Sequence, residues 1–141
     1  MEIFESKKVK GVRSHINNLI SIANSDGNFS IAEKRLIFAI GRRQGLSNEK
    51  LKEIIKSNEP IKFKVPSDDA ARFDQVAELV EMLLADGTAT ENEIATCIEM
   101  AEKLGFRKAI VGVLVRKLVL GMQNGKSKEE LRLECANFLC F

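Results

Sequence analysis

The sequence lacks tryptophan and tyrosine altogether, and its 141 residues include a single histidine, two prolines and three cysteines. The cysteines, Cys97, Cys135 and Cys140, are odd in number and have no Cys-x-x-Cys spacing, so they support neither a disulfide framework nor a zinc knuckle. We interpret His15 as a partly exposed packing residue rather than a catalytic base. Acid–base, nucleophilic and redox chemistry each require a group of residues that this chain does not supply, so we expect no enzyme.

A long hydrophobic segment is also missing. The first eight residues contain no apolar region of the kind found in signal peptides. The most apolar run, residues 109–122, is interrupted by Arg116 and Lys117 and is too short to span a bilayer. Cysteines without a disulfide pattern fit a reducing compartment. We therefore expect a soluble, cytoplasmic protein with no transmembrane segment.

Neither sign of charge is in large excess: the chain has 22 basic and 20 acidic residues, and its net charge is +2. This balance gives no reason to expect a nucleic-acid partner. The two halves differ, however: residues 1–66 carry 13 basic and 7 acidic side chains (net +6), whereas residues 67–141 carry 9 and 13 (net −4). An ordinary solvated surface is the simpler interpretation of this split, and a partner surface is the alternative.

Apolar residues make up 45% of the chain and recur at helical spacing along most of its length. The periodicity predicts an all-α fold with helices at residues 12–23, 30–44, 47–56, 67–85, 90–104, 110–122 and 127–141. We expect Ile31 to face inward in the second helix and Ile55 to do so in the third. In the fifth helix Cys97 and Ile98 are expected on the buried face, which makes Cys97 an unreactive core thiol.

One stretch of the sequence occurs twice: residues 25–33 are Ser-Asp-Gly-Asn-Phe-Ser-Ile-Ala-Glu, and residues 85–93 are Ala-Asp-Gly-Thr-Ala-Thr-Glu-Asn-Glu. At this offset of 60, the matching positions are Asp26 with Asp86, Gly27 with Gly87, Ser30 with Thr90, Glu33 with Glu93 and Gly45 with Gly105. A repeat of this length is typical of a duplicated helix-turn-helix unit. It predicts one domain, residues 1–141, with a first repeat at 12–57, a connector at 58–66, a second repeat at 67–123 and a C-terminal helix at 127–141.

Each copy places an aspartate in the turn and a glutamate seven positions later, giving the candidate ligands Asp26, Glu33, Asp86 and Glu93. Oxygen ligands around a glycine-containing turn suit a hard cation such as Ca²⁺, Mg²⁺ or Mn²⁺. The leading aspartate of an EF-hand loop is absent, so an ordinary EF-hand is excluded. Two arrangements remain: the copies share one site across a pseudo-twofold axis, or each binds a weak, largely hydrated ion.

Helix capping explains the same residues without a metal. Ser30 with Glu33 and Thr90 with Glu93 have the spacing of a capping box, and an aspartate before a helix N-terminus interacts favourably with the helix dipole. Ser127 to Glu130 has this spacing a third time but without Asp-Gly, so the chain uses capping boxes in the absence of any candidate ligand turn.

Asp-Gly followed by an acidic residue at a helix start, twice in a helical chain and with Leu104-Gly105-Phe106 after the second copy, resembles the TerB-like tellurite-resistance family. The resemblance covers about residues 12–119. It implies an all-helical, internally duplicated domain, and metal binding by the turn carboxylates Asp26, Glu33, Asp86 and Glu93.

Two functions follow as expectations. The first is a cytoplasmic, non-enzymatic, stress- or tellurite-resistance-related protein with a divalent cation as its cofactor and no small-molecule substrate. The second is a metal-free helical module that binds a protein partner or forms a homo-oligomer, which the strongly apolar helix at 110–122 and the charge split indicate.

Overall fold

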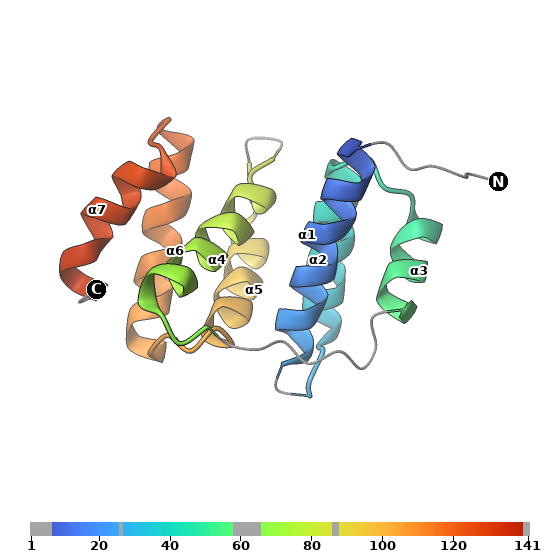
Figure 1. Ribbon diagram of the computed structural model, residues 1–141, viewed down its shortest axis with the longest axis horizontal. Coiled ribbons are helices and arrows are strands. Elements are labelled where there is room, and N and C mark those ends of the chain that lie inside the picture. Colours follow the sequence, from blue (N-terminus) through green and yellow to red (C-terminus); the bar gives the residue numbers. More distant parts are fainter. Residues whose placement is uncertain (1–6, 26, 58–65, 86–87, 140–141) are drawn as a thin grey trace. The chain divides into compact units, whose positions relative to one another are not determined.

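The computed structural model describes residues 7–25, 27–57, 66–85 and 88–139. Within these ranges it contains seven α-helices and no strand, so the predicted all-α fold is confirmed (Figure 1). The helices are α1 (Lys7–Asn24), α2 (Ile31–Arg43), α3 (Asn48–Ser57), α4 (Asp69–Leu83), α5 (Glu91–Glu102), α6 (Lys108–Gln123) and α7 (Lys128–Leu139). None of these described helices combines the length and the apolar character that crossing a membrane requires.

The helices divide into two compact units, residues 1–63 and 64–141. In the first unit α1, α2 and α3 contact one another pairwise, and in the second α4, α5 and α6 do the same, with α7 packed on α6. The division falls inside the predicted connector 58–66, of which residues 58–65 lie outside the described residues. The internal duplication and the single-domain organisation stay predictions.

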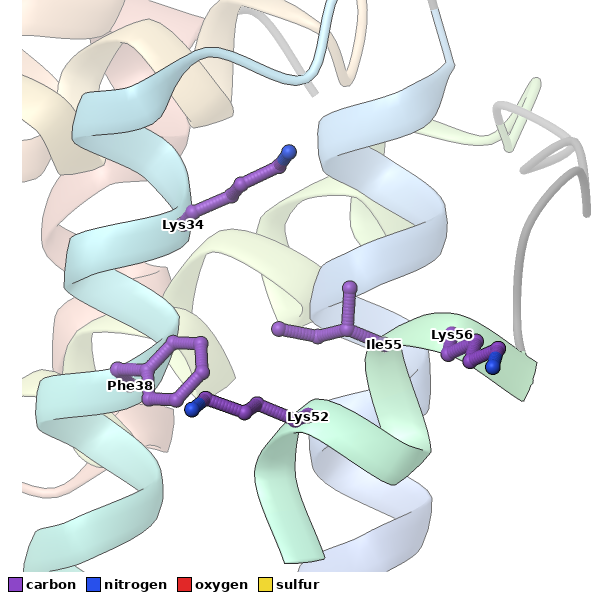
Figure 2. A pocket seen from close by; sticks show the side chains of 5 residues that line it. All are labelled: Lys34, Phe38, Lys52, Ile55 and Lys56. Carbon is purple, nitrogen blue, oxygen red and sulfur yellow. The ribbon is translucent and has the colours of Figure 1, made fainter. Parts of the chain in front are cut away.

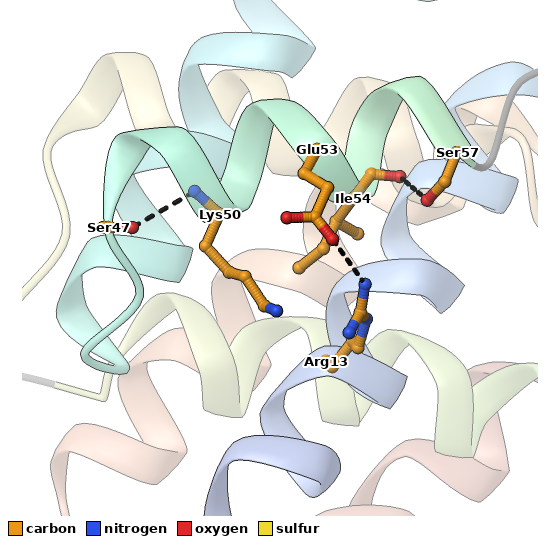
Figure 3. Close-up of polar contacts among 6 residues, drawn as sticks. All are labelled: Arg13, Ser47, Lys50, Glu53, Ile54 and Ser57. Carbon is orange, nitrogen blue, oxygen red and sulfur yellow. Dashed lines mark hydrogen bonds and ion pairs between the residues drawn. The ribbon is translucent and has the colours of Figure 1, made fainter. Parts of the chain in front are cut away.

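Helix α3 is defined at both ends by hydroxyl groups (Figure 3). At its start the Lys50 amide donates to Ser47 Oγ at 3.1 Å, and at its end Ser57 Oγ donates to the Ile54 carbonyl at 3.1 Å. Between them Glu53 accepts from Arg13 of α1 over 3.4 Å. The carboxylate of Glu53 is therefore directed toward α1.

Each unit has a core made by the apolar stripes that the periodicity predicted. The fully buried large side chains include Ile16, Leu19, Ile20, Ile22, Ile37, Ile40, Leu51 and Ile54 in the first unit, and Phe73, Leu79, Leu83, Met100, Leu104, Leu114, Leu118 and Leu131 in the second. One assignment is shifted: Ile98 is half-buried, and Met100 takes a fully buried place. Helix α5 contacts both α4 and α6, so its buried face is wider than a single stripe.

Two glycines allow a leucine of the next helix to pack directly on a helix backbone. A Cβ atom at Gly41 of α2 would lie 2.3 Å from Leu51 Cδ2, and one at Gly121 of α6 would lie 2.4 Å from Leu131 Cδ2. Both leucines are fully buried, so they have little room to move. The α2–α3 and α6–α7 contacts therefore depend on glycine at these positions.

Two glycine-to-alanine substitutions in α6 distinguish the effect of this close packing on stability from the effect of helix propensity. No atom lies within 4 Å of a Cβ placed at Gly112, so Gly112→Ala is expected to raise the free energy of unfolding by about 0.5–1 kcal/mol. At Gly121 the same gain is outweighed by overpacking against Leu131, which costs about 1–3 kcal/mol. Gly121→Ala is therefore expected to lower the free energy of unfolding, measured by urea denaturation. An equal increase in the free energy of unfolding in both variants would contradict the close packing of α7 on α6.

Candidate metal-binding turns

The capping boxes predicted for the two copies are both present. At the start of α2 the Ser30 amide donates to Glu33 Oε1 at 3.0 Å, and the Glu33 amide donates to Ser30 Oγ at 3.1 Å. At the start of α5 the Thr90 amide donates to Glu93 Oε1 at 2.9 Å, and the Glu93 amide donates to Thr90 Oγ1 at 3.1 Å. Each glutamate thus accepts a capping hydrogen bond through Oε1.

The two glutamates differ in how deeply they lie. Glu33 is 1% exposed and is the one charged side chain that is buried in the described part of the chain, whereas Glu93 is half-buried. Burial removes the Glu33 carboxylate from water, which is unfavourable for a charged group unless hydrogen bonds or a cation compensate it. The first turn is therefore the more enclosed of the two.

The third capping box has only one of its two hydrogen bonds between backbone amide and side chain. The Glu130 amide donates to Ser127 Oγ at 3.1 Å, as expected, but the Glu130 carboxylate meets the Ser127 hydroxyl, at 3.4 Å, instead of the Ser127 amide. Both residues are exposed. This turn has no Asp-Gly, and it gives a natural comparison for the other two.

The aspartates of the predicted site, Asp26 and Asp86, lie outside the described residues. Glu33 is placed in the first turn of α2 and Glu93 in the first turn of α5, one in each unit. Within the described ranges, no three histidine, cysteine, aspartate or glutamate side chains form a group that could bind a metal ion. A hard cation takes six or more oxygens, so a turn with one aspartate and one glutamate fits an ion that keeps most of its water.

The cysteines of the described chain are core residues. Cys97 is fully buried between the helices of the second unit, and burial raises the pKa of its thiol from 9.0 to about 12. Burial also raises the pKa of Cys135. The expectation that Cys97 lies in the core is therefore confirmed; a neutral thiol is neither a nucleophile nor a metal ligand, so its lack of reactivity stays a prediction. Cys140 lies outside the described residues.

Sequence analysis missed a hollow on α2 and α3, which we call the basic hollow. It has two adjoining parts of about 300 and 440 Å³ that share Lys34 and Phe38. The other lining residues are Ile31, Arg35, Arg42, Lys52, Ile55 and Lys56. Figure 2 shows Phe38 and Ile55 directed into the space between the two helices, with Lys34 and Lys52 reaching into it.

Two sequence predictions were wrong at this hollow. Ile31 was expected to face inward but is 69% exposed, and Ile55 is only half-buried. At 100° per residue, Ile31 lies on the same side of α2 as Phe38 and opposite Ile40, so it cannot share the core stripe. Counting this angle along α2 would have placed an exposed basic and apolar stripe on the helix.

Comparison with known proteins found no matching family model, no matching curated protein and no matching solved structure. The resemblance to the TerB-like family therefore remains an inference from the residues of the two turns.

Proposed function

We propose that this chain is a non-enzymatic, TerB-like, stress-related cytoplasmic protein whose acidic turns bind a divalent cation. The observation that supports the proposal is the buried carboxylate of Glu33 in the first turn of α2. A cation beside this group would compensate the burial of its charge, together with the capping bond from the Ser30 amide. Asp26 is the second carboxylate of the same turn, and Asp86 with Glu93 would serve the second turn.

The cation in this proposal is structural. It would neutralise the carboxylates and fix each turn against the helix that follows, while water supplies the other ligands. Both arrangements named above stay open: one ion shared by Asp26, Glu33, Asp86 and Glu93, or one hydrated ion in each turn. Catalysis is not part of the proposal, because the described cysteines are buried in the core.

Thermal unfolding in Ca²⁺, Mg²⁺, Mn²⁺ or EDTA tests the proposal. A ligand at about 100 times its dissociation constant adds about 2.7 kcal/mol to the free energy of unfolding, so a millimolar ion is expected to raise the melting temperature of the wild type. The informative variant is Glu33→Gln, because glutamine keeps the capping acceptor but removes the charge. We expect it to weaken the response to metal, and the Asp26→Ala, Asp86→Ala double variant, which removes a carboxylate from both turns, to abolish it.

Glu130→Gln is the matched control, since it changes the glutamate of a turn that has no Asp-Gly. It is expected to keep the full response to metal. An unchanged melting temperature in wild type and double variant alike would contradict the proposal. If Glu33→Gln and Glu130→Gln weaken the metal-induced rise in melting temperature equally, the ions bind non-specifically.

A second candidate is a metal-free protein-interaction module, and the basic hollow favours it. The hollow places apolar and cationic side chains together on one exposed face of the first unit. This function needs no divalent cation, so EDTA is expected to leave it intact.

A further inference from the structure

The basic hollow combines five cations with an apolar floor. Lys34, Arg35 and Arg42 come from α2, and Lys52 and Lys56 come from α3. Phe38 and Ile55 lie between them, and exposed Ile31 extends the apolar strip along α2. A surface of this kind fits a ligand that offers an apolar side chain flanked by negative charges.

No acidic residue lines either part of the hollow. Glu53 of α3 is directed to Arg13 of α1 instead. Within the described part of the chain, the contacts of the lining cations are with uncharged groups: Lys34 Nζ lies 5.3 Å from the centre of the Phe29 ring, and Arg42 donates to Asn48 Oδ1 at 3.5 Å. Within the described part of unit one, none of the five lining cations forms an ion pair with a carboxylate.

The second unit exposes a surface of the complementary kind on α7. Leu133 is 75% exposed, and Glu129 and Glu130 lie next to it on the helix surface, four and three residues earlier. Glu134 forms an ion pair with Lys126. The hydrogen bond from Lys126 lowers the pKa of the Glu134 carboxyl group. Glu129 and Glu130 are exposed and flank Leu133; Glu129 and Leu133 lie on the α7 face opposite buried Leu131, and Glu130 lies at its side.

We infer that α7 of a second copy of this chain binds in the basic hollow. Leu133 of that copy contacts Phe38 and Ile55, and its Glu129 and Glu130 lie among the lysines of α2 and α3. An amphipathic helix in a groove between two helices is an established mode of recognition, and the opposite charges set its orientation. The inference rests on the second candidate function and is independent of metal binding.

Sedimentation equilibrium of the wild-type chain, in low salt and with EDTA, tests this association. We expect the average mass to rise with protein concentration, and the association to weaken by about tenfold or more between about 50 and 500 mM NaCl, because salt screens the charges. Lys52→Glu with Lys56→Glu reverses the charge of the hollow, and Glu129→Lys with Glu130→Lys reverses that of α7. Each double variant alone is expected to be monomeric.

The decisive experiment is sedimentation equilibrium of a mixture of the two double variants. Each reversed surface then meets a partner of opposite charge, so the mixture is expected to associate although neither component does so alone. Leu133→Ser, which leaves every charge in place, is expected to weaken wild-type association by about tenfold or more. Lys108→Glu with Glu81→Lys, two exposed positions outside both surfaces, is the matched control and is expected to associate like wild type. Far-ultraviolet circular dichroism checks that each variant is folded.

Several outcomes would overturn the inference. One is a wild-type chain that is monomeric at every concentration, including a monomer that binds anionic vesicles or a DNA duplex through the hollow. Another is self-association that neither pair of charge reversals changes, which would leave an interaction module with a different contact surface. A mixture that stays monomeric while both variants are folded would also contradict it. Loss of the metal response, by contrast, would affect only the first proposed function.

Discussion

Phe73→Ala is expected to lower the free energy of unfolding by about 3–5 kcal/mol, the largest loss from any single truncation in the second unit. Phe73 is fully buried, and among the residues whose burial is described it is the largest fully buried side chain. It belongs to α4, which contacts both α5 and α6, and the cavity left by the ring would be enclosed because the side chain is fully buried. Such a cavity cannot close without moving helices that are packed on one another.

Urea denaturation followed by far-ultraviolet circular dichroism measures this loss. Phe38→Ala is the matched control, since it removes the same ring from the half-exposed basic hollow, where water can fill the space. We expect Phe38→Ala to cost clearly less than Phe73→Ala, because much less apolar surface is returned to water. Equal losses in the two variants would contradict the core position of Phe73.

The same contrast shows how far sequence periodicity predicts this fold. Phe73, Val76, Val80 and Leu83 follow one another at helical spacing, and all four are fully buried in α4. The turns were equally informative, because Gly45 and Gly105, matched at the offset of 60, both have a φ of 94° in the turn that follows a helix. Local signals such as these depend on few neighbours, so a single sequence is enough to read them.

Features that depend on packing between helices could not be predicted in this way. Spacing alone assigns Glu33 and Glu93 the same capping role, and that role is confirmed, but only Glu33 is buried. Ile31 was assigned to the core because it is apolar, although its angle around α2 places it beside Phe38 in the basic hollow.

The charge split along the chain has a structural counterpart in the first unit. Five of its basic side chains line one hollow, which is a closer grouping than an evenly solvated surface requires. In the second unit the exposed acidic residues Glu129 and Glu130 flank an exposed leucine on α7. The split is therefore compatible with a contact between copies as well as with solvation, and the mixing experiment decides between them.

Raising the pH above about 9 is expected to destabilise the wild-type chain through Cys97 more than it destabilises a Cys97→Ala variant. The pKa of the thiol is 9.0 in an unfolded chain and about 12 in the folded one, because burial disfavours the thiolate. Below pH 9 both states keep the proton, and the contribution of this shift to stability is complete. Between pH 9 and 12 only the unfolded state loses the proton, so unfolding becomes easier as the pH rises.

The size of the effect follows from the interval between the two pKa values of Cys97. Each pKa unit corresponds to about 1.4 kcal/mol, so a loss of stability on the order of 3 kcal/mol is expected by pH 11, in excess of the loss in Cys97→Ala. Urea denaturation in a thiol-protecting reductant, at several pH values from about 7.5 to 11, gives both curves. The two chains are compared by the slope of the free energy of unfolding against pH. The cavity left by alanine lowers the free energy of unfolding of the variant by the same amount at every pH. Every other titrating group, Cys135 included, is common to the two chains, so parallel curves would show that the Cys97 thiol ionises as readily in the folded protein as in the unfolded one.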